Sequence, residues 1–344
     1  MWTSGPSCAT KPAMTHNLKR AFIIAGLVAA SYLGAGTAQA DQALPSLPVE
    51  SYQLQNGLKV ILHEDHTTPV VSVNVWYHVG SKDETARRNG FAHLFEHLMF
   101  QGSKHVAEDT FFRHLEGAGA SNTNGTTSDD RTNYYETVPS NQLELALWLE
   151  SDRMGFLLDH VDQATFESQR NVVKNERRQN YEDAPYGLVS KFLREAQFPA
   201  SHPYHNLTIG SYEDLDAASL DDVKTFYKTY YLPNNANLVI AGDITVSSAK
   251  TLVEKYFAPI SRGSAPAVIT SPMPVTIPSE VVIPVEASVE LPRVYVSYVT
   301  PAFFAPGDAA LDALAQVLTG GKTSRLYKRL VYDLQIATDV HAFQ

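Results

Sequence analysis

Residues 91–100, FAHLFEHLMF, place two histidines and one glutamate in a run that is otherwise apolar. A helix over this stretch brings His93, Glu96 and His97 within an arc of about 100°. Apolar side chains cover the rest of the helix, so we expect the polar arc to be buried as well. Because burying an unpaired carboxylate costs roughly several kcal/mol, the fold must supply a compensating partner.

A metal cation is one such partner. Two imidazoles at positions i and i+4 can reach one ion from the same face, and zinc suits two histidines, one carboxylate and an open fourth position. The order His-x-x-Glu-His is the inverted zincin motif, in which the glutamate, here Glu96, acts as general base on water. The alternative is a helix with two hydrogen-bonded histidines and a partly exposed glutamate, and five residues alone leave both open.

A catalytic zinc site needs a third protein ligand, and the segment ESQRNVVKNERRQNYED contains the best candidate. On a helix, Gln169 and Glu176 share one face with two valines, at the spacing i, i+3, i+4 and i+7. Glu167 falls on the opposite face. Glu176 therefore lies in line with a buried stripe, where an unpaired carboxylate is costly.

The charge of the chain excludes some classes of function. The 344 residues carry a net charge of −10; residues 1–40 hold three basic and no acidic residues, so the rest has 24 basic against 37 acidic residues, or −13. An acidic body argues against nucleic-acid binding, which needs basic surface. The only cysteine is Cys8, close to the N-terminus and before the apolar stretch at 21–33, so we expect core burial or a bound metal, not a disulfide, to stabilise the protein.

Residues 1–40 resemble a secretory signal peptide. Lys19 and Arg20 precede an apolar stretch over 21–33, and Ala38-Gln39-Ala40 is a small-x-small cleavage site that would leave Asp41 as the first mature residue. Thirteen apolar residues are short for a membrane span, which takes about 20. We therefore expect export, to a bacterial periplasm, with no span in the mature chain; the alternative is an uncleaved membrane anchor.

The remaining chain predicts an α+β fold, because strands come first, several helices follow, and one strand and one helix close the unit. A hairpin is expected around Asn56-Gly57. Further strands are expected at 69–81, 124–128, 132–138 and 235–244, with helices at 89–100, 108–115, 140–158, 162–181, 186–197, 217–230 and 246–257. After a Pro/Ser/Ala-rich stretch, strands at 279–287 and 292–299 and helices at 307–318 and 323–333 begin a new unit.

Four segments together resemble the pitrilysin/insulinase metallopeptidases. NGFAHLFEHLMFQGS resembles the family's active-site helix, G-x-A-H-x-x-E-H, and VVKNERRQNYEDAPYG resembles the segment with the third zinc ligand; Glu176 lies 79 positions after His97. GASNTNGTTSDDRTNYYETV resembles the substrate-binding edge strand. TGGKTSRLYKRLVYDLQIAT resembles the opening of the second domain. The resemblance covers about residues 48–344.

The resemblance implies a zinc peptidase. One Zn²⁺ per chain would be held by His93, His97 and Glu176, with Glu96 as general base. Gln169 stands where relatives often have a glutamate that supports the zinc ligands. This difference implies a change in how the residues around the ligands adjust the zinc site.

The substrate implied is an extended peptide or unfolded polypeptide. It would pair with the edge strand at Asn124, Gly125 and Thr126, where Gly125 replaces the family's alanine. The family's Arg/Tyr pair, which helps to bind substrate, belongs to a later domain, so a partner chain or C-terminal domains would have to supply it.

The domain organisation implied is a signal peptide at 1–40, a zinc-binding peptidase domain at 41–258, a linker at 259–277, and the truncated start of a second, inactive domain at 278–344. Each domain would be an antiparallel sheet packed against helices, the second one incomplete. The competing function is a non-catalytic assembly subunit that works only with a partner. TGGKTS at 319–324 resembles the end of a P-loop, but it lacks the first glycine and the preceding strand.

Overall fold

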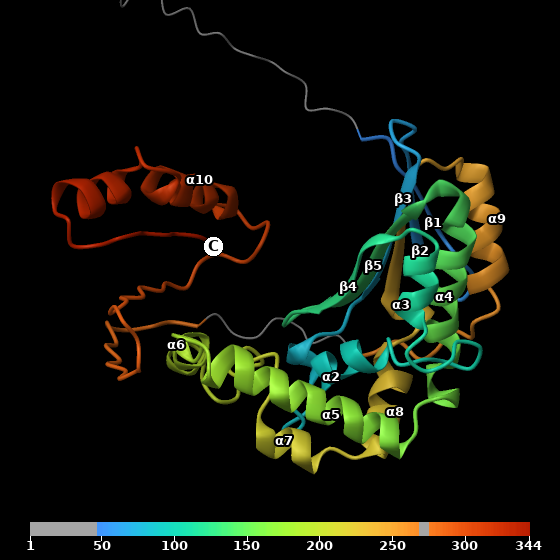
Figure 1. The fold of residues 1–344 in the computed structure, drawn as a ribbon, viewed down its shortest axis with the longest axis horizontal. Helices are drawn as coiled ribbons and strands as arrows, with labels where there is room; N and C mark the ends of the chain where they lie inside the picture. The colour runs from blue at the N-terminus through green and yellow to red at the C-terminus, as the bar shows by residue number, and fades with distance from the viewer. Residues whose placement is uncertain (1–46, 268–274) are drawn as a thin grey trace, which may run out of the picture. The chain divides into compact units, whose positions relative to one another are not determined.

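The computed structural model describes residues 47–267 and 275–344 (Figure 1). The predicted signal peptide and residues 268–274 of the predicted linker lie outside the described residues. Among the helices that are described, none combines the length and the apolar character needed to cross a membrane.

One six-stranded sheet organises the first part of the chain. Its strands are β1 (Glu50–Gln53), β2 (Lys59–Glu64), β3 (Val70–Tyr77), β4 (Ser121–Thr127), β5 (Thr132–Pro139) and β6 (Ala236–Gly242). Their order in space is β1-β2-β6-β3-β5-β4, so β6 inserts between two strands that follow each other in sequence. Every neighbouring pair is antiparallel except β2 and β6, which are parallel; the connection between these two strands contains β3, β4, β5 and most of the helices.

Both predicted hairpins are present. β1 and β2 pair around Asn56-Gly57, where Gly57 has a φ of +94° that favours glycine. The Asn56 side chain donates to the carbonyl oxygens of Phe257 and Ile260 at 2.7 and 2.9 Å, which ties the hairpin to the end of a later helix. β4 and β5 form the second hairpin, with an irregularity in β4 between Ser121 and Asn124.

The helices follow the predicted order with shifted ends. They are α2 (Phe91–Leu98), α3 (Phe111–Gly117), α4 (Leu143–Phe156), α5 (Gln163–Arg177), α6 (Val189–Gln197), α7 (Tyr212–Ala217), α8 (Leu220–Tyr230) and α9 (Val246–Phe257), with short helical turns η1 (Ser81–Asp83), η2 (Ser140–Gln142), η3 (Leu157–Asp159) and η5 (Pro233–Asn235). α3 begins later than expected because Asp109 has a non-helical φ of +55°. The helix expected at 217–230 starts at Leu220, where Ser219 forms a capping box with Asp222, and α7 was not predicted.

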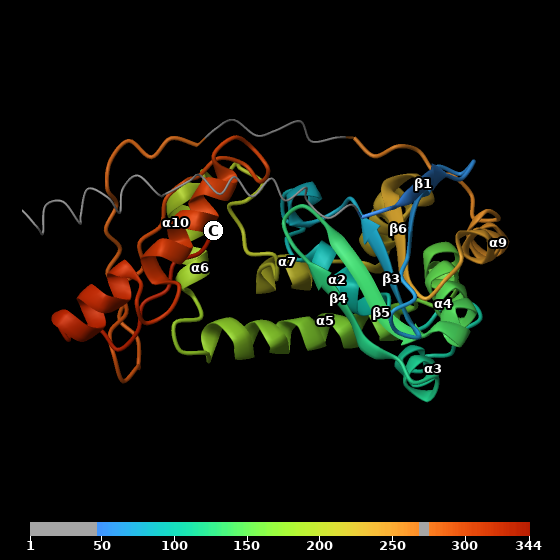
Figure 2. The same ribbon diagram turned by 90° about the horizontal axis from the view of Figure 1, so that it is seen from above.

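The core lies between the sheet and the helices on one of its faces. Alternate residues of β3, from Val71 to Tyr77, are fully buried, as period-2 alternation predicts. α4 packs on β3 and β5, and α9 packs on β2 (Figure 1). α2 packs against β4 and β5, and α5 runs alongside α2 (Figure 2). The motif helix therefore lies at the β4 edge of the sheet.

In residues 275–344 the expected strands at 279–287 and 292–299 were wrong, since the structure has no strand there. Their apolar side chains are exposed, Val282 by 77% and Val296 by 70%. Alternation of apolar residues does not make a strand without a neighbour to accept its backbone hydrogen bonds. The two expected helices correspond to α10 (Asp308–Thr319) and to the π-helical turn η6 (Tyr327–Asp333).

Candidate metal centre

The start of α2 is held by a side chain from outside the helix. Its N-cap is Gly90, which has a φ of +99° and no side chain to cap the first turn. Glu84 takes over that role, because its carboxylate accepts hydrogen bonds from the backbone N–H of Gly90 at 3.0 Å and of Ala92 at 2.8 Å. A Cβ on Gly90 would lie 2.8 Å from the carbonyl oxygen of Ile209. Glycine at this position thus allows residues 209–210 to pack closely against the first turn of α2.

The structure brings three of the predicted residues to one point. Glu176 Oε2 on α5 lies 3.3 Å from His97 Nε2 and 3.7 Å from His93 Nε2 on α2. One ligand atom from each residue can be chosen so that all three lie within 4.8 Å of one another. The side chains are 13%, 21% and 32% exposed for His93, His97 and Glu176. The cluster is therefore partly shielded and still open on one side.

The charges in this cluster suit a cation. Burial, together with the charge of His97, lowers the pKa of His93 to about 4, although Glu176 opposes the shift. The hydrogen bond with His97 lowers the pKa of Glu176 against the effect of burial. At neutral pH His93 is thus neutral and Glu176 is ionised, which are the forms that bind a divalent metal. Two imidazole nitrogens and one carboxylate facing one point fit zinc.

Glu96 lies beside the cluster without belonging to it. Its Oε2 accepts a hydrogen bond of 2.6 Å from Thr127 Oγ1 on β4. Burial raises the pKa of Glu96, and the Thr127 hydrogen bond works in the other direction. A carboxylate with a raised pKa binds a proton more tightly, which is what a general base needs.

The predicted peptide-binding residues lie on β4, which ends the sheet and leaves one strand edge without a partner strand among the described residues. Gly125 faces α2, whereas Thr126 faces the other way, where its hydroxyl donates to Asn133 Oδ1 at 2.6 Å. Asn124 turns its side-chain oxygen to the backbone N–H of Gly125 at 2.9 Å. The position agrees with edge-strand pairing of a peptide.

Gln169 lies on α5, two turns before Glu176, and is 8% exposed. Among the hydrogen bonds of the described residues, none joins Gln169 to the histidines or to Glu176. Asn180 does contact the cluster, because its Nδ2 donates to Glu176 Oε1 at 3.3 Å.

Three contacts of the site were missed by sequence reasoning. Asn180 lies in the π-helical turn η4 (Arg178–Glu182), one turn after Glu176, so its i+4 spacing was an available signal. Thr127 is two residues after Gly125, so strand alternation places both on one face. Glu84 offers no local signal, because its partners depend on how the chain folds back before α2.

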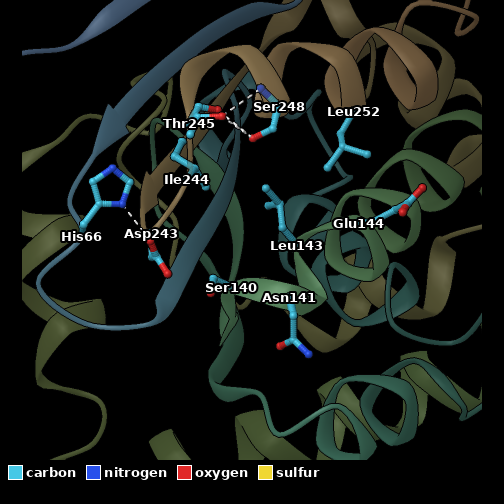
Figure 3. A pocket seen from close by; sticks show the side chains of 10 residues that line it. All are labelled: His66, Ser140, Asn141, Leu143, Glu144, Asp243, Ile244, Thr245, Ser248 and Leu252. Atoms are coloured by element: carbon cyan, nitrogen blue, oxygen red, sulfur yellow. Dashed lines mark hydrogen bonds and ion pairs between the residues drawn. The ribbon is translucent and has the colours of Figure 1, made fainter.

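A separate hollow of about 360 Å³ lies near the ends of β3, β5 and β6 (Figure 3). It contains two serines, a histidine and an aspartate, but Asp243 is bound to His66, with Oδ1 2.7 Å from Nδ1. No hydrogen bond among the described residues joins Ser140 or Ser248 to His66. This arrangement does not activate a serine nucleophile, which needs the histidine between the other two groups.

Comparison with known proteins identifies the family of the chain. The family model described as Insulinase (Peptidase family M16) matches residues 59–207, and the model described as Peptidase M16 inactive domain matches residues 217–344. This chain belongs to the pitrilysin/insulinase family of metallopeptidases. The fold is that of the family's protease domains.

Relatives of this family member include zinc protease PqqE of Helicobacter pylori, 32% identical over 293 residues. The match covers 84% of this chain and 65% of PqqE. This chain matches a crystal structure of a protease from Helicobacter pylori with a TM-score of 0.73 and 29% sequence identity. The match covers 86% of this chain and 70% of the protease chain. The periplasmic protease PqqL from Escherichia coli, at 22% identity and a TM-score of 0.61, shares the fold over 67% of this chain and 26% of its own.

Proposed function

We propose that this chain carries the zinc ligands and the general base of a zinc-dependent endopeptidase or oligopeptidase that cleaves extended peptides. The observation that carries the proposal is the meeting of His93, His97 and Glu176 at one point, with Glu96 beside them. The names of relatives such as zinc protease PqqE support a metallopeptidase. Holding four such groups together in a partly buried cluster has no evident use in a protein that only packs against others.

In this proposal His93, His97 and Glu176 hold one Zn²⁺ per chain. When bound, the ion would polarise the scissile carbonyl and make water more acidic. Glu96 takes the proton from the attacking water and later donates it to the departing amine. Because Thr127 donates a hydrogen bond to Oε2 of Glu96, Oε1 is the oxygen that takes the proton. Gln169 supports the α5 face that carries Glu176, without a direct contact.

The substrate in this proposal is a peptide or an unfolded polypeptide. It lies extended along the free edge of β4 and exchanges backbone hydrogen bonds with residues 124–126. Backbone recognition of this kind is independent of side-chain identity, so specificity must come from residues outside the strand edge.

We further propose the domain organisation expected above, with the peptidase domain at 41–258 and a second, inactive domain beginning at 278. The chain spans 65% of the length of PqqE. The Arg/Tyr pair implied by the family would then come from later domains or a partner chain. The basic and apolar pattern of residues 1–40 supports export to the periplasm, and one structural neighbour is a periplasmic protease.

The test uses the full-length protein, its zinc content and cleavage of a quenched fluorescent peptide. Glu96→Gln should keep one zinc per chain and lose about 100-fold or more in kcat, since a positioned general base contributes about 10²–10⁴-fold. Glu167→Gln, the same change on the exposed opposite face of α5, is the matched control and should cleave at the wild-type rate. A chelator should abolish cleavage.

Two results would contradict the proposal. Wild-type turnover by Glu96→Gln would remove Glu96 from the reaction. Stoichiometric zinc without cleavage in the full-length wild type would favour the alternative, a non-catalytic subunit that works with a partner chain.

A further inference from the structure

Strand β4 contacts Glu96 at two positions on the same face. Thr127 donates its hydroxyl to Glu96 Oε2 at 2.6 Å. Gly125, two residues earlier, lies so close that a Cβ added there would be 2.9 Å from Glu96 Cγ. Successive strand residues point to opposite faces, so Gly125 and Thr127 present themselves to α2 while Thr126 between them does not.

The hydrogen bond from Thr127 is the only one that the Glu96 side chain makes among the described residues. A glutamate side chain has three rotatable bonds, and a single anchored oxygen fixes where the other oxygen lies. Hydrogen bonds to a charged group are among the strongest in proteins. Thr127 is therefore placed to select one orientation of the carboxylate.

Gly125 lies against the same side chain. The position of its missing Cβ is bounded by Glu96 Cγ, by Phe100 Cε2 at 3.1 Å and by Tyr134 Cδ1 at 3.2 Å. Tyr134 is fully buried and Phe100 is 9% exposed. The Glu96 side chain therefore lies close to strand β4, where Thr127 supplies its hydrogen bond.

We propose that Thr127 is a positioning residue for Glu96. This inference rests on the proposed function, since it assigns the orientation of the base in that reaction. It makes β4 serve two purposes, as the edge that receives a peptide and as the surface that aims Glu96.

The first variant removes only the donor. Thr127→Val keeps the shape of threonine, so zinc content and KM should stay within about twofold of wild type, while kcat falls by about tenfold or more. Thr127→Ser restores the hydroxyl and should recover kcat to within about threefold. Thr137→Val is the matched control, because Thr137 makes its hydrogen bond to Ser72, at 2.9 Å, on the opposite face of the sheet.

Crystal structures of Thr127→Val and Thr127→Ser supply a readout apart from activity. Glu96 should leave its wild-type position in Thr127→Val and keep it in Thr127→Ser.

The outcomes separate the two proposals. If Glu96→Gln is inactive while Thr127→Val retains wild-type kcat, the positioning role is wrong and the proposed function stands. Loss of zinc or of folding in Thr127→Val, or failure of Thr127→Ser to recover kcat, would make Thr127 a structural residue and overturn the inference. A full-length wild type without peptidase activity would overturn the proposed function, and Glu96 would then be tested in the crystal structures alone.

Discussion

Replacement of Glu136 by glutamine should stabilise the protein at neutral pH, although Glu136 lies in the core. Glu136 on β5 is 1% exposed, and neither of its oxygens receives a hydrogen bond from a described residue. Its neighbour Glu150 on α4 is fully buried and already paired with Arg153, whose Nε donates to Glu150 Oε2 at 3.0 Å. One cation faces two carboxyl groups, so one of them must stay neutral.

The pKa of Glu136 is raised well above its usual value, first by burial and then by the charge of Glu150. The group is therefore protonated in the folded state and ionised in the unfolded state over a range above pH 4.5. Folding takes up a proton there, so stability falls as pH rises and the penalty disappears below pH 4.5. Each pH unit between 4.5 and the folded-state pKa costs about 1.4 kcal/mol.

Glutamine resembles the protonated carboxyl and removes the titration. We expect the melting temperatures of wild type and Glu136→Gln to agree near pH 4.5 and to diverge as the pH rises, by about 3–6 °C per pH unit while the folded carboxyl stays protonated, at about 2–4 °C per kcal/mol. Thermal unfolding followed by circular dichroism from pH 4.5 to 7.5 measures this. Glu116→Gln, the same change at an exposed position of α3, should leave the pH profile unchanged. A pH-independent difference, or a less stable variant at pH 7, would refute the reasoning.

Two further predictions concern the supports of the site. Glu84→Ala leaves the N–H groups of Gly90 and Ala92 without their acceptor. The free energy of unfolding in urea should fall by about 2–4 kcal/mol, and zinc affinity should weaken. Unchanged zinc affinity would show that Glu84 does not hold α2 in place. Arg194→Ala removes the guanidinium that donates twice to Asp129, at 2.8 Å each, in the β4–β5 turn. Amide exchange of β4 and β5 should then become faster, and protection equal to wild type would contradict this.

Local signals predicted much of the fold. Asn56-Gly57 and the alternating residues around it predicted the β1–β2 hairpin, because turn conformation depends on a few neighbouring residues. The bounds expected for the helix at 246–257 agree with α9, where Thr245 caps the first turn. The partnership of Glu176 with His93 could be expected from the cost of burying charges, since each side needed a counterpart.

Other features depend on contacts between distant residues and could not be predicted from short patterns. The parallel pairing of β2 with β6 joins residues about 180 positions apart, such as Ile61 and Val239. The buried Arg153 reads as an ordinary surface residue of an amphipathic helix, yet Phe111 and Tyr134 enclose its guanidinium, with centroids 4.4 and 4.3 Å away. Residues 279–299 contain the apolar residues of two strands, but no strand among the described residues pairs with them.

The place of β6 in the sheet sets the order in which the chain can fold. β2 and β3 are separated by residues 65–69 only, yet they do not pair, because β6 lies between them. The β1–β2 hairpin and the β3–β5–β4 group can each form early, but each keeps an unpaired edge until residues 236–242 arrive. Completion of the sheet is thus a late step that pairs residues far apart in the sequence. A chain released before Ala236 would expose two strand edges with unpaired backbone N–H and C=O groups, and it would aggregate.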